Sequence, residues 1–264
     1  MVFTITTKDL QPLCTDFEFV VNDIDELADR IVKLMMGWCA HVSMIVRSLA
    51  EGYSEPDIDA DTITSLIETL DKSGKSDTVK CHIDGWIFQM ISWLVLAEQH
   101  KDNPTFNQYP PHPQPAMHGL DGIAILLKED STIDRIIITE DKCTTSPRNK
   151  IQQQVYPEFA KFENGKKNTA IMNSVAGMLM NTKIFFKIQN DITKKDYRQY
   201  RIVITRADAH DSNAGRKALF ADYDDIVKGN VERRTCSTTN FLDTRAWIED
   251  LRLRITSKLN ALLP

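Results

Sequence analysis

Two apolar runs of strand length, residues 123–127 and 135–139, constrain the fold of this chain more than any other feature. Both are rich in β-branched residues, and a polar, charged segment at 128–134 separates them. Two such runs joined by a polar turn are typical of a β-hairpin. The sequence therefore predicts a pair of antiparallel strands within the stretch 118–156, and the other predicted elements are placed around them.

Charged residues stand at one end of this predicted hairpin. Asp121 opens the first run, and Glu140, Asp141 and Lys142 close the second. Side chains at positions i and i+2 of a strand project from the same face. Glu140 and Lys142 are therefore expected to project together, with Asp141 pointing away and Asp121 contributed by the neighbouring strand.

This set of charges suits the chemistry of phosphate esters. Carboxylate oxygens are preferred ligands of hard divalent cations such as Mg²⁺ or Mn²⁺. A bound cation polarises a phosphoryl oxygen and lowers the pKa of its water, while a nearby lysine orients that water or offsets negative charge in the transition state. Asp121, Glu140 and Lys142 supply these parts.

The order of these residues resembles the D…(D/E)-x-K signature of the PD-(D/E)xK nuclease superfamily. Gln152 and Tyr156, on the next predicted helix, are similar to the Q-x-x-x-Y element of its RecB-like branch. The resemblance implies an α/β fold with a restriction-endonuclease-like core, in which helices flank a central mixed sheet. A mostly helical N-terminal part would precede this core.

The resemblance also implies a role for each site residue. Asp121 and Glu140 would be metal ligands, together with the backbone carbonyl of Asp141. Lys142 would be the catalytic lysine. Gln152 and Tyr156 would be accessory site residues that help to place DNA at the metal.

More narrowly, the His-Gly-x-Asp-Gly-Ile segment that begins at His118, the Glu-x-Lys strand and the helical first half resemble the HamA effector nucleases of Hachiman anti-phage systems. This resemblance implies a cytoplasmic, Mg²⁺- or Mn²⁺-dependent nuclease that acts on DNA. It also implies a complex with a helicase subunit similar to HamB, which delivers the DNA or releases the nuclease.

Charge is distributed unevenly along the chain. The formal net charge of −5 argues against binding nucleic acid over the whole surface. Residues 142–206, however, hold thirteen Lys or Arg and only four Asp or Glu. This basic segment could meet a polyanion, although its side chains could equally form an ordinary solvated face.

Cysteine and hydropathy patterns indicate a soluble, reduced protein. The five cysteines are scattered and form no C-x-x-C pair, so neither a disulfide framework nor a zinc site is predicted. No apolar run approaches the roughly 18 residues of a membrane span, and residues 1–5 lack the features of a signal peptide. We therefore expect a cytosolic protein without a membrane partner.

The remaining elements follow from hydrophobic periodicity and from breakers. The proline-rich segment 101–115 is expected to be an ordered loop without regular structure, although an interdomain linker is the alternative. We divide the chain into residues 1–80 and 81–264, or into one continuous domain. Helices are expected at 24–35 with a continuation toward 49, and at 61–70, 86–98, 147–162, 168–180 and 243–263; strands are expected at 17–21, 183–188 and 200–205.

Two alternatives to a DNA nuclease remain open. The first core helix of the superfamily often contributes a glutamate, whereas the predicted helix 86–98 offers only Gln89 in its middle. This difference favours a nuclease-like module that has lost activity and binds a partner. A nuclease that cleaves RNA is the other alternative.

Overall fold

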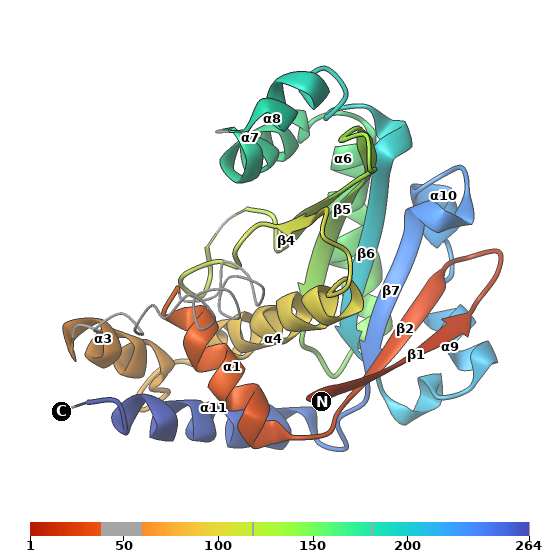
Figure 1. The fold of residues 1–264 in the computed structure, drawn as a ribbon. Helices are drawn as coiled ribbons and strands as arrows, with labels where there is room; N and C mark the ends of the chain where they lie inside the picture. Colours follow the sequence, from red (N-terminus) through yellow and green to blue (C-terminus); the bar gives the residue numbers. More distant parts are fainter. Residues whose placement is uncertain (38–59, 118, 181, 264) are drawn as a thin grey trace.

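The computed structural model describes residues 1–37, 60–117, 119–180 and 182–263, and this part of the chain forms a mixed α/β protein around a curled seven-stranded sheet (Figure 1). The strand order is β1-β2-β7-β6-β5-β4-β3. The strands are β1 (Phe3–Asp9), β2 (Thr15–Val21), β3 (Phe106–Gln108), β4 (Gly122–Leu127), β5 (Ile133–Lys142), β6 (Arg198–Thr205) and β7 (Arg234–Thr239).

The predicted hairpin is confirmed as β4 and β5. The two strands are antiparallel, with Gly122 opposite Thr139, and β5 continues three residues beyond this pair to Lys142. On its other side β5 pairs in parallel with β6, and β6 pairs in parallel with β7. The start of β4 and the end of β5 therefore lie at the same end of the sheet.

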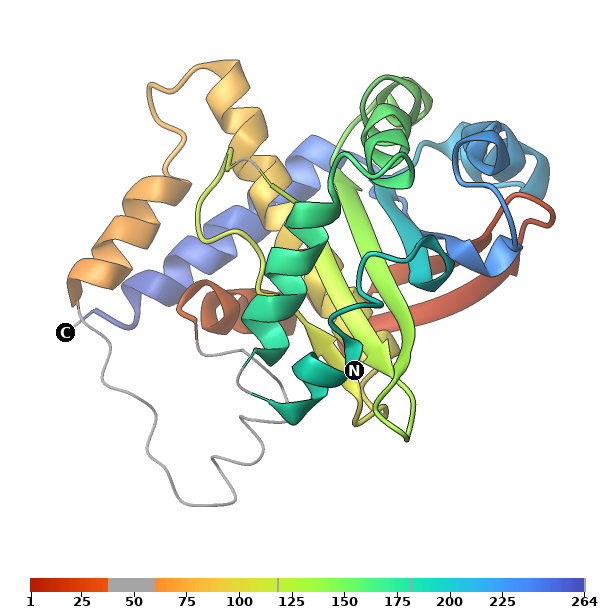
Figure 2. The same ribbon diagram turned by 90° about the horizontal axis from the view of Figure 1, so that it is seen from above.

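Helices cover both faces of the sheet. Figure 1 shows α4 in front of the strands and α6 behind them, and Figure 2 shows the same layers from above. One hydrophobic cluster joins α1, α3, α4 and α11 to the sheet, and a second joins α6 and α7 to it. The helices are α1 (Ile24–Met35), α3 (Ala60–Leu70), α4 (Asp77–Gln99), α5 (Pro147–Lys150), α6 (Tyr156–Glu163), α7 (Asn168–Leu179), α8 (Lys183–Ile188), α9 (Asn213–Leu219), α10 (Tyr223–Ile226) and α11 (Thr244–Asn260).

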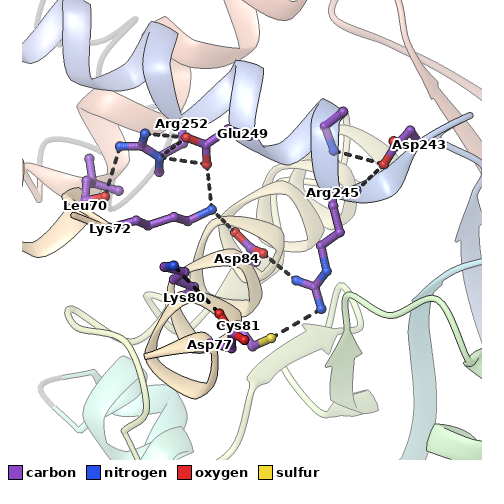
Figure 3. Close-up of polar contacts among 11 residues, drawn as sticks. Leu70, Lys72, Asp77, Lys80, Cys81, Asp84, Asp243, Arg245, Glu249 and Arg252 are labelled. Atoms are coloured by element: carbon purple, nitrogen blue, oxygen red, sulfur yellow. Dashed lines mark hydrogen bonds and ion pairs between the residues drawn. The ribbon is translucent and has the colours of Figure 1, made fainter. Parts of the chain in front are cut away.

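Helix α4 is the buried helix that the sequence predicts, although it begins earlier, after the N-cap Ser76. Its Asp84 is only 4% exposed and accepts a 2.6 Å hydrogen bond from Lys72. Arg245 of α11 also pairs with Asp84, and Lys72 reaches Glu249 of α11 at 2.7 Å (Figure 3). These ion pairs join α4 to α11.

The proline-rich segment 101–115 is ordered against α4. Trp93 Nε1 donates to the carbonyl of Tyr109 at 2.9 Å, and Trp86 Nε1 donates to the carbonyl of His112 at 2.7 Å. The prediction of an ordered loop is therefore confirmed, with one correction. Residues Phe106–Gln108 form β3 and pair with β4, which is possible because they stand between the prolines.

The predicted strand at 183–188 is wrong, because this segment is helix α8. One side of α8 packs against the hydrophobic cluster that joins α6 and α7 to the sheet, through Ile184, Phe185 and Ile188. Phe186, on the other side of α8, is 67% exposed. This spacing is that of one helical face. The β-branched and aromatic composition suggested a strand, but packing against the neighbouring helix decides the conformation.

The N-terminal strands belong to the same sheet as the hairpin. β2 pairs in parallel with β7, so residues from both parts of the proposed division at residue 80 share one sheet. The predicted continuation of the first helix toward residue 49 lies outside the described residues. Within the described residues, no helix is both long enough and apolar enough to cross a bilayer.

Candidate active site

Asp121, Glu140 and Lys142 meet at one end of the β4–β5 hairpin. The Lys142 Nζ atom lies 2.9 Å from Asp121 Oδ2 and 3.0 Å from Glu140 Oε2. Glu140 and Lys142 share a face of β5 because they are two residues apart, and Asp121 immediately precedes β4. The structure thus brings these three predicted residues together.

Two hydrogen bonds that involve backbone groups fix the position of Asp121. Its Oδ2 atom accepts a 3.0 Å hydrogen bond from the backbone N–H of Asp141. The buried side chain of Gln89, on α4, donates to the backbone carbonyl of Asp121 at 2.5 Å. Gln89 therefore contacts the site only at the backbone of Asp121, and this contact orients Asp121.

Asp141 contributes its backbone and not its carboxylate to this cluster. Its side chain faces α4, where the hydroxyl of Ser92 favours the charged carboxylate, but burial and the charge of Asp121 raise the pKa of Asp141 to about 7. The N–H and C=O of one strand residue point toward the same neighbouring strand. Because its N–H reaches Asp121, the carbonyl of Asp141 also points toward Asp121.

Burial and like charge dominate the electrostatics of the site. Glu140 is 6% exposed, and burial together with the nearby Asp121 carboxylate raises its pKa to about 8, against the opposite effect of Lys142. For Lys142, burial acts to lower the pKa, but Glu140 and Asp121 outweigh it and raise the pKa. If both carboxylates ionised, one ammonium would leave an excess negative charge. The raised pKa means that Glu140 keeps a proton instead, and a bound divalent cation would take the place of that proton.

The oxygen atoms of the site fit a hard divalent cation. Asp121 Oδ1 and Glu140 Oε1 form no hydrogen bond with any described residue. Strand geometry indicates that the Asp141 carbonyl lies on the same edge of β5 as the Asp141 N–H, which donates to Asp121. Carboxylate and carbonyl oxygens are ligands that Mg²⁺ accepts while it keeps several waters. Among the described residues, no group of three or more His, Cys, Asp or Glu side chains is placed to hold a metal ion. The site would thus provide two carboxylates and a carbonyl.

Among the described residues, no hydrogen bond or ion pair joins Gln152 or Tyr156 to this cluster. Gln152 is exposed, in a π-helical turn at Ile151–Val155 that leads directly into α6. Pro157 explains this turn, because it has no N–H to continue the α-helical pattern. Tyr156 is buried, and its hydroxyl donates to the carbonyls of Phe220 and Ala221 at 3.0 and 2.9 Å.

Tyr156 is therefore expected to stabilise the fold more than it serves the site. Tyr156→Phe would leave the carbonyl of Phe220 without this donor, which costs about 1–3 kcal/mol, while the carbonyl of Ala221 keeps the 2.7 Å hydrogen bond from Arg148. Urea denaturation should show this loss, while divalent-cation binding at Asp121 and Glu140 stays unchanged. A Tyr156→Phe protein with parental stability and weakened cation binding would instead support the role implied by the Q-x-x-x-Y resemblance.

Glu158 is a site neighbour that the sequence reasoning missed. It lies on α6, and its charge contributes to the raised pKa of Glu140. Lys161 and Lys167 hold Glu158 at 2.8 and 2.5 Å. The sequence hinted at this position, because Glu158 is the first acidic residue after Asp141. The structure places it on the helix that covers this face of the hairpin.

The basic segment 142–206 is only partly a surface. Arg198, Arg201 and Arg206 are buried, and Arg198 donates to the carbonyl of Phe162 and, at 2.7 Å, to Asn168. Exposed lysines remain on α6, on α8 and on the neighbouring loops, namely Lys161, Lys166, Lys183, Lys187, Lys194 and Lys195. Lys187 donates to the carbonyl of Asp130 in the turn between β4 and β5, at the end of the hairpin away from the site. His118, next to the loop that enters β4, lies outside the described residues.

Comparison with protein-family models, curated proteins and solved structures found no match for this chain.

Proposed function

We propose that this chain is a metal-dependent nuclease that hydrolyses phosphodiester bonds in DNA. The observation that carries the proposal is the convergence of Asp121, Glu140 and Lys142, with the lysine nitrogen within 3.0 Å of both carboxylates. The resemblance to the PD-(D/E)xK superfamily, with its restriction-endonuclease-like core, supports the same conclusion. A mixed sheet with helices on both faces agrees with that core at a coarse level.

Each residue has a role that follows from its position. Asp121, Glu140 and the carbonyl of Asp141 would hold Mg²⁺ or Mn²⁺. The bound cation would lower the pKa of a water molecule and polarise the phosphoryl oxygen. The Lys142 ammonium offsets negative charge that develops on the phosphate, and Gln89 holds the backbone of Asp121 in place.

The proposed substrate and partner rest on the resemblance to HamA effectors. DNA would be delivered, or the nuclease released, by a helicase subunit similar to HamB, within an anti-phage defence complex in the cytoplasm. Two features support a need for such help. The chain has a net charge of −5, and two lysines beside the site, Lys161 and Lys167, are already paired with Glu158. Such a surface favours weak DNA binding by the chain alone.

A second candidate is a nuclease-like module that binds a partner without catalysis. Two observations favour it. Helix α4 offers Gln89 where the superfamily often has a glutamate, and Tyr156 is committed to the carbonyls of Phe220 and Ala221. An inactive module of this kind would not need to bind a cation at these carboxylates.

Cleavage assays distinguish the two candidates. The parent protein, with and without the helicase, is incubated with Mg²⁺ or Mn²⁺ and with single-stranded DNA, duplex DNA or RNA. We expect the parent to degrade DNA only when metal is present, and we expect Asp121→Asn to abolish this activity. The control Glu129→Gln should retain it, because Glu129 is an exposed carboxylate at the other end of the hairpin. Equal DNA degradation by Asp121→Asn and the parent would show the assignment to be wrong, and preferential loss of RNA would correct the substrate.

A further inference from the structure

A cavity with both apolar and polar lining residues lies on the opposite face of the sheet from the carboxylate cluster. It has a volume of about 160 Å³ and is enclosed by the end of α4 and by strands β2, β5, β6 and β7. Its apolar lining residues are Phe17, Leu96 and Ile137, and its polar lining residues are Gln99, His100, Arg135, Gln199, Arg201 and Thr235. Two arginines and no acidic residue therefore face this cavity.

Arg201 is a buried cation without a close anion. It is 2% exposed, and its guanidinium bonds to the hydroxyls of Ser92 and Ser237, both at 3.1 Å. Among the described residues, no carboxylate lies within ion-pair distance of it; Asp141 is the carboxylate whose charge acts on it most strongly. A buried charge with only neutral partners is costly, and an anion in the cavity would compensate it.

Further donors surround the cavity. Arg135 pairs through Nε with Asp134 at 3.1 Å, and its two Nη groups donate to no described residue. The Nε2 group of Gln99 is buried and has no acceptor among the described residues. The residues that carry these donors line the cavity from β5, from β6 and from the end of α4.

The same charges act on His100. Burial lowers its pKa to about 4, and Arg201 and Arg135 act in the same direction. His100 is therefore neutral at pH 7 and stacks on Phe106, with ring centroids 4.7 Å apart. It forms a wall of the cavity and can still donate one hydrogen bond.

We propose that this cavity binds a compact phosphate group, either orthophosphate or the terminal phosphate of a small phosphorylated molecule. An apolar cavity of about 150 Å³ accommodates benzene, so a cavity of this size holds the five heavy atoms of phosphate but not a whole nucleotide. The ligand would neutralise the charges of Arg201 and Arg135. This site is independent of the nuclease proposal, because it uses a different face of the sheet and different residues.

Calorimetric titration of the whole chain with orthophosphate tests the proposal, with chloride at equal ionic strength as reference. The test variant is Arg135→Gln, because Arg135 is 35% exposed and the fold does not depend on burying it. Arg254→Gln is the matched control, since Arg254 is also 35% exposed and lies on α11, outside this cavity. Titrations with AMP and adenosine distinguish a terminal phosphate from the free ion.

We expect saturable binding of orthophosphate by the parent and by Arg254→Gln, weakened about tenfold or more in Arg135→Gln. Binding of AMP but not adenosine would extend the site to a terminal phosphate, and exclusion of AMP would restrict it to the free ion. The proposal fails if orthophosphate gives no more heat than chloride, or if Arg135→Gln binds it as tightly as the parent. Neither failure would affect cation binding at Asp121 and Glu140.

Discussion

Replacing Lys142 by methionine is expected to slow DNA cleavage at least about a hundredfold, the usual effect of removing one group that stabilises transition-state charge. Methionine keeps most of the length of the side chain but removes the ammonium that lies within 3.0 Å of Asp121 and Glu140. The measurement is the rate of DNA loss at saturating Mg²⁺, with Lys128→Met as the matched control. Lys128 is an exposed lysine at the far end of the hairpin, so its loss is expected to leave the rate unchanged.

Cation binding by the Lys142→Met protein separates catalysis from folding. Removal of the ammonium leaves two carboxylates without their counter-charge, so Mg²⁺ is expected to bind at least as tightly as in the parent. Tight binding combined with slow cleavage would identify Lys142 as a catalytic residue. A parental cleavage rate would exclude Lys142 from the mechanism.

Replacing Glu140 by glutamine is expected to abolish metal-dependent cleavage and to stabilise the fold at alkaline pH. Burial and Asp121 raise the pKa of Glu140 from 4.5 to about 8, so the folded protein keeps a proton that the unfolded chain has lost. The folded state is therefore favoured at low pH, and this contribution is lost as pH rises from about 4.5 to about 8. Glutamine does not ionise, so the variant avoids this loss.

The stability of Glu140→Gln relative to the parent is expected to depend on pH. At pH 8 without metal, Glu140→Gln should be more stable than the parent by about 1–3 kcal/mol. At pH 5 the difference should nearly vanish, and Mg²⁺ at pH 8 should stabilise the parent but not the variant. Urea denaturation at both pH values measures these differences. A stability difference that does not change with pH would show that Glu140 is not the titrating group.

The sequence was sufficient to predict the hairpin and the meeting of its charged ends. The alternation of side chains in a strand places Glu140 and Lys142 on one face, and a tight antiparallel turn returns the chain so that Asp121 lies beside them. Both rules are local, so they need no knowledge of the rest of the fold. The buried helix α4 was predictable for a similar reason, since its apolar run is continuous.

Features that depend on contacts between residues far apart in the sequence could not be predicted in this way. Residues 183–188 have the composition of a strand but form α8, because Ile184 and Ile188 find a buried surface beneath α7. Tyr156 has the spacing of a site residue, yet its hydroxyl meets carbonyls some 65 positions later in the chain. Arg201, within an apparently basic surface segment, lies between α4 and the sheet.

Calorimetric titration of the metal-free protein with Mn²⁺ tests the central claim, that Asp121 and Glu140 form a divalent-cation site, without depending on a partner or a substrate. We predict saturable heat in the parent and in Glu129→Gln, and its loss in both Asp121→Asn and Glu140→Gln. Absence of heat in the parent, or equal heat in Glu140→Gln, would contradict the account and would favour a nuclease-like module without catalysis.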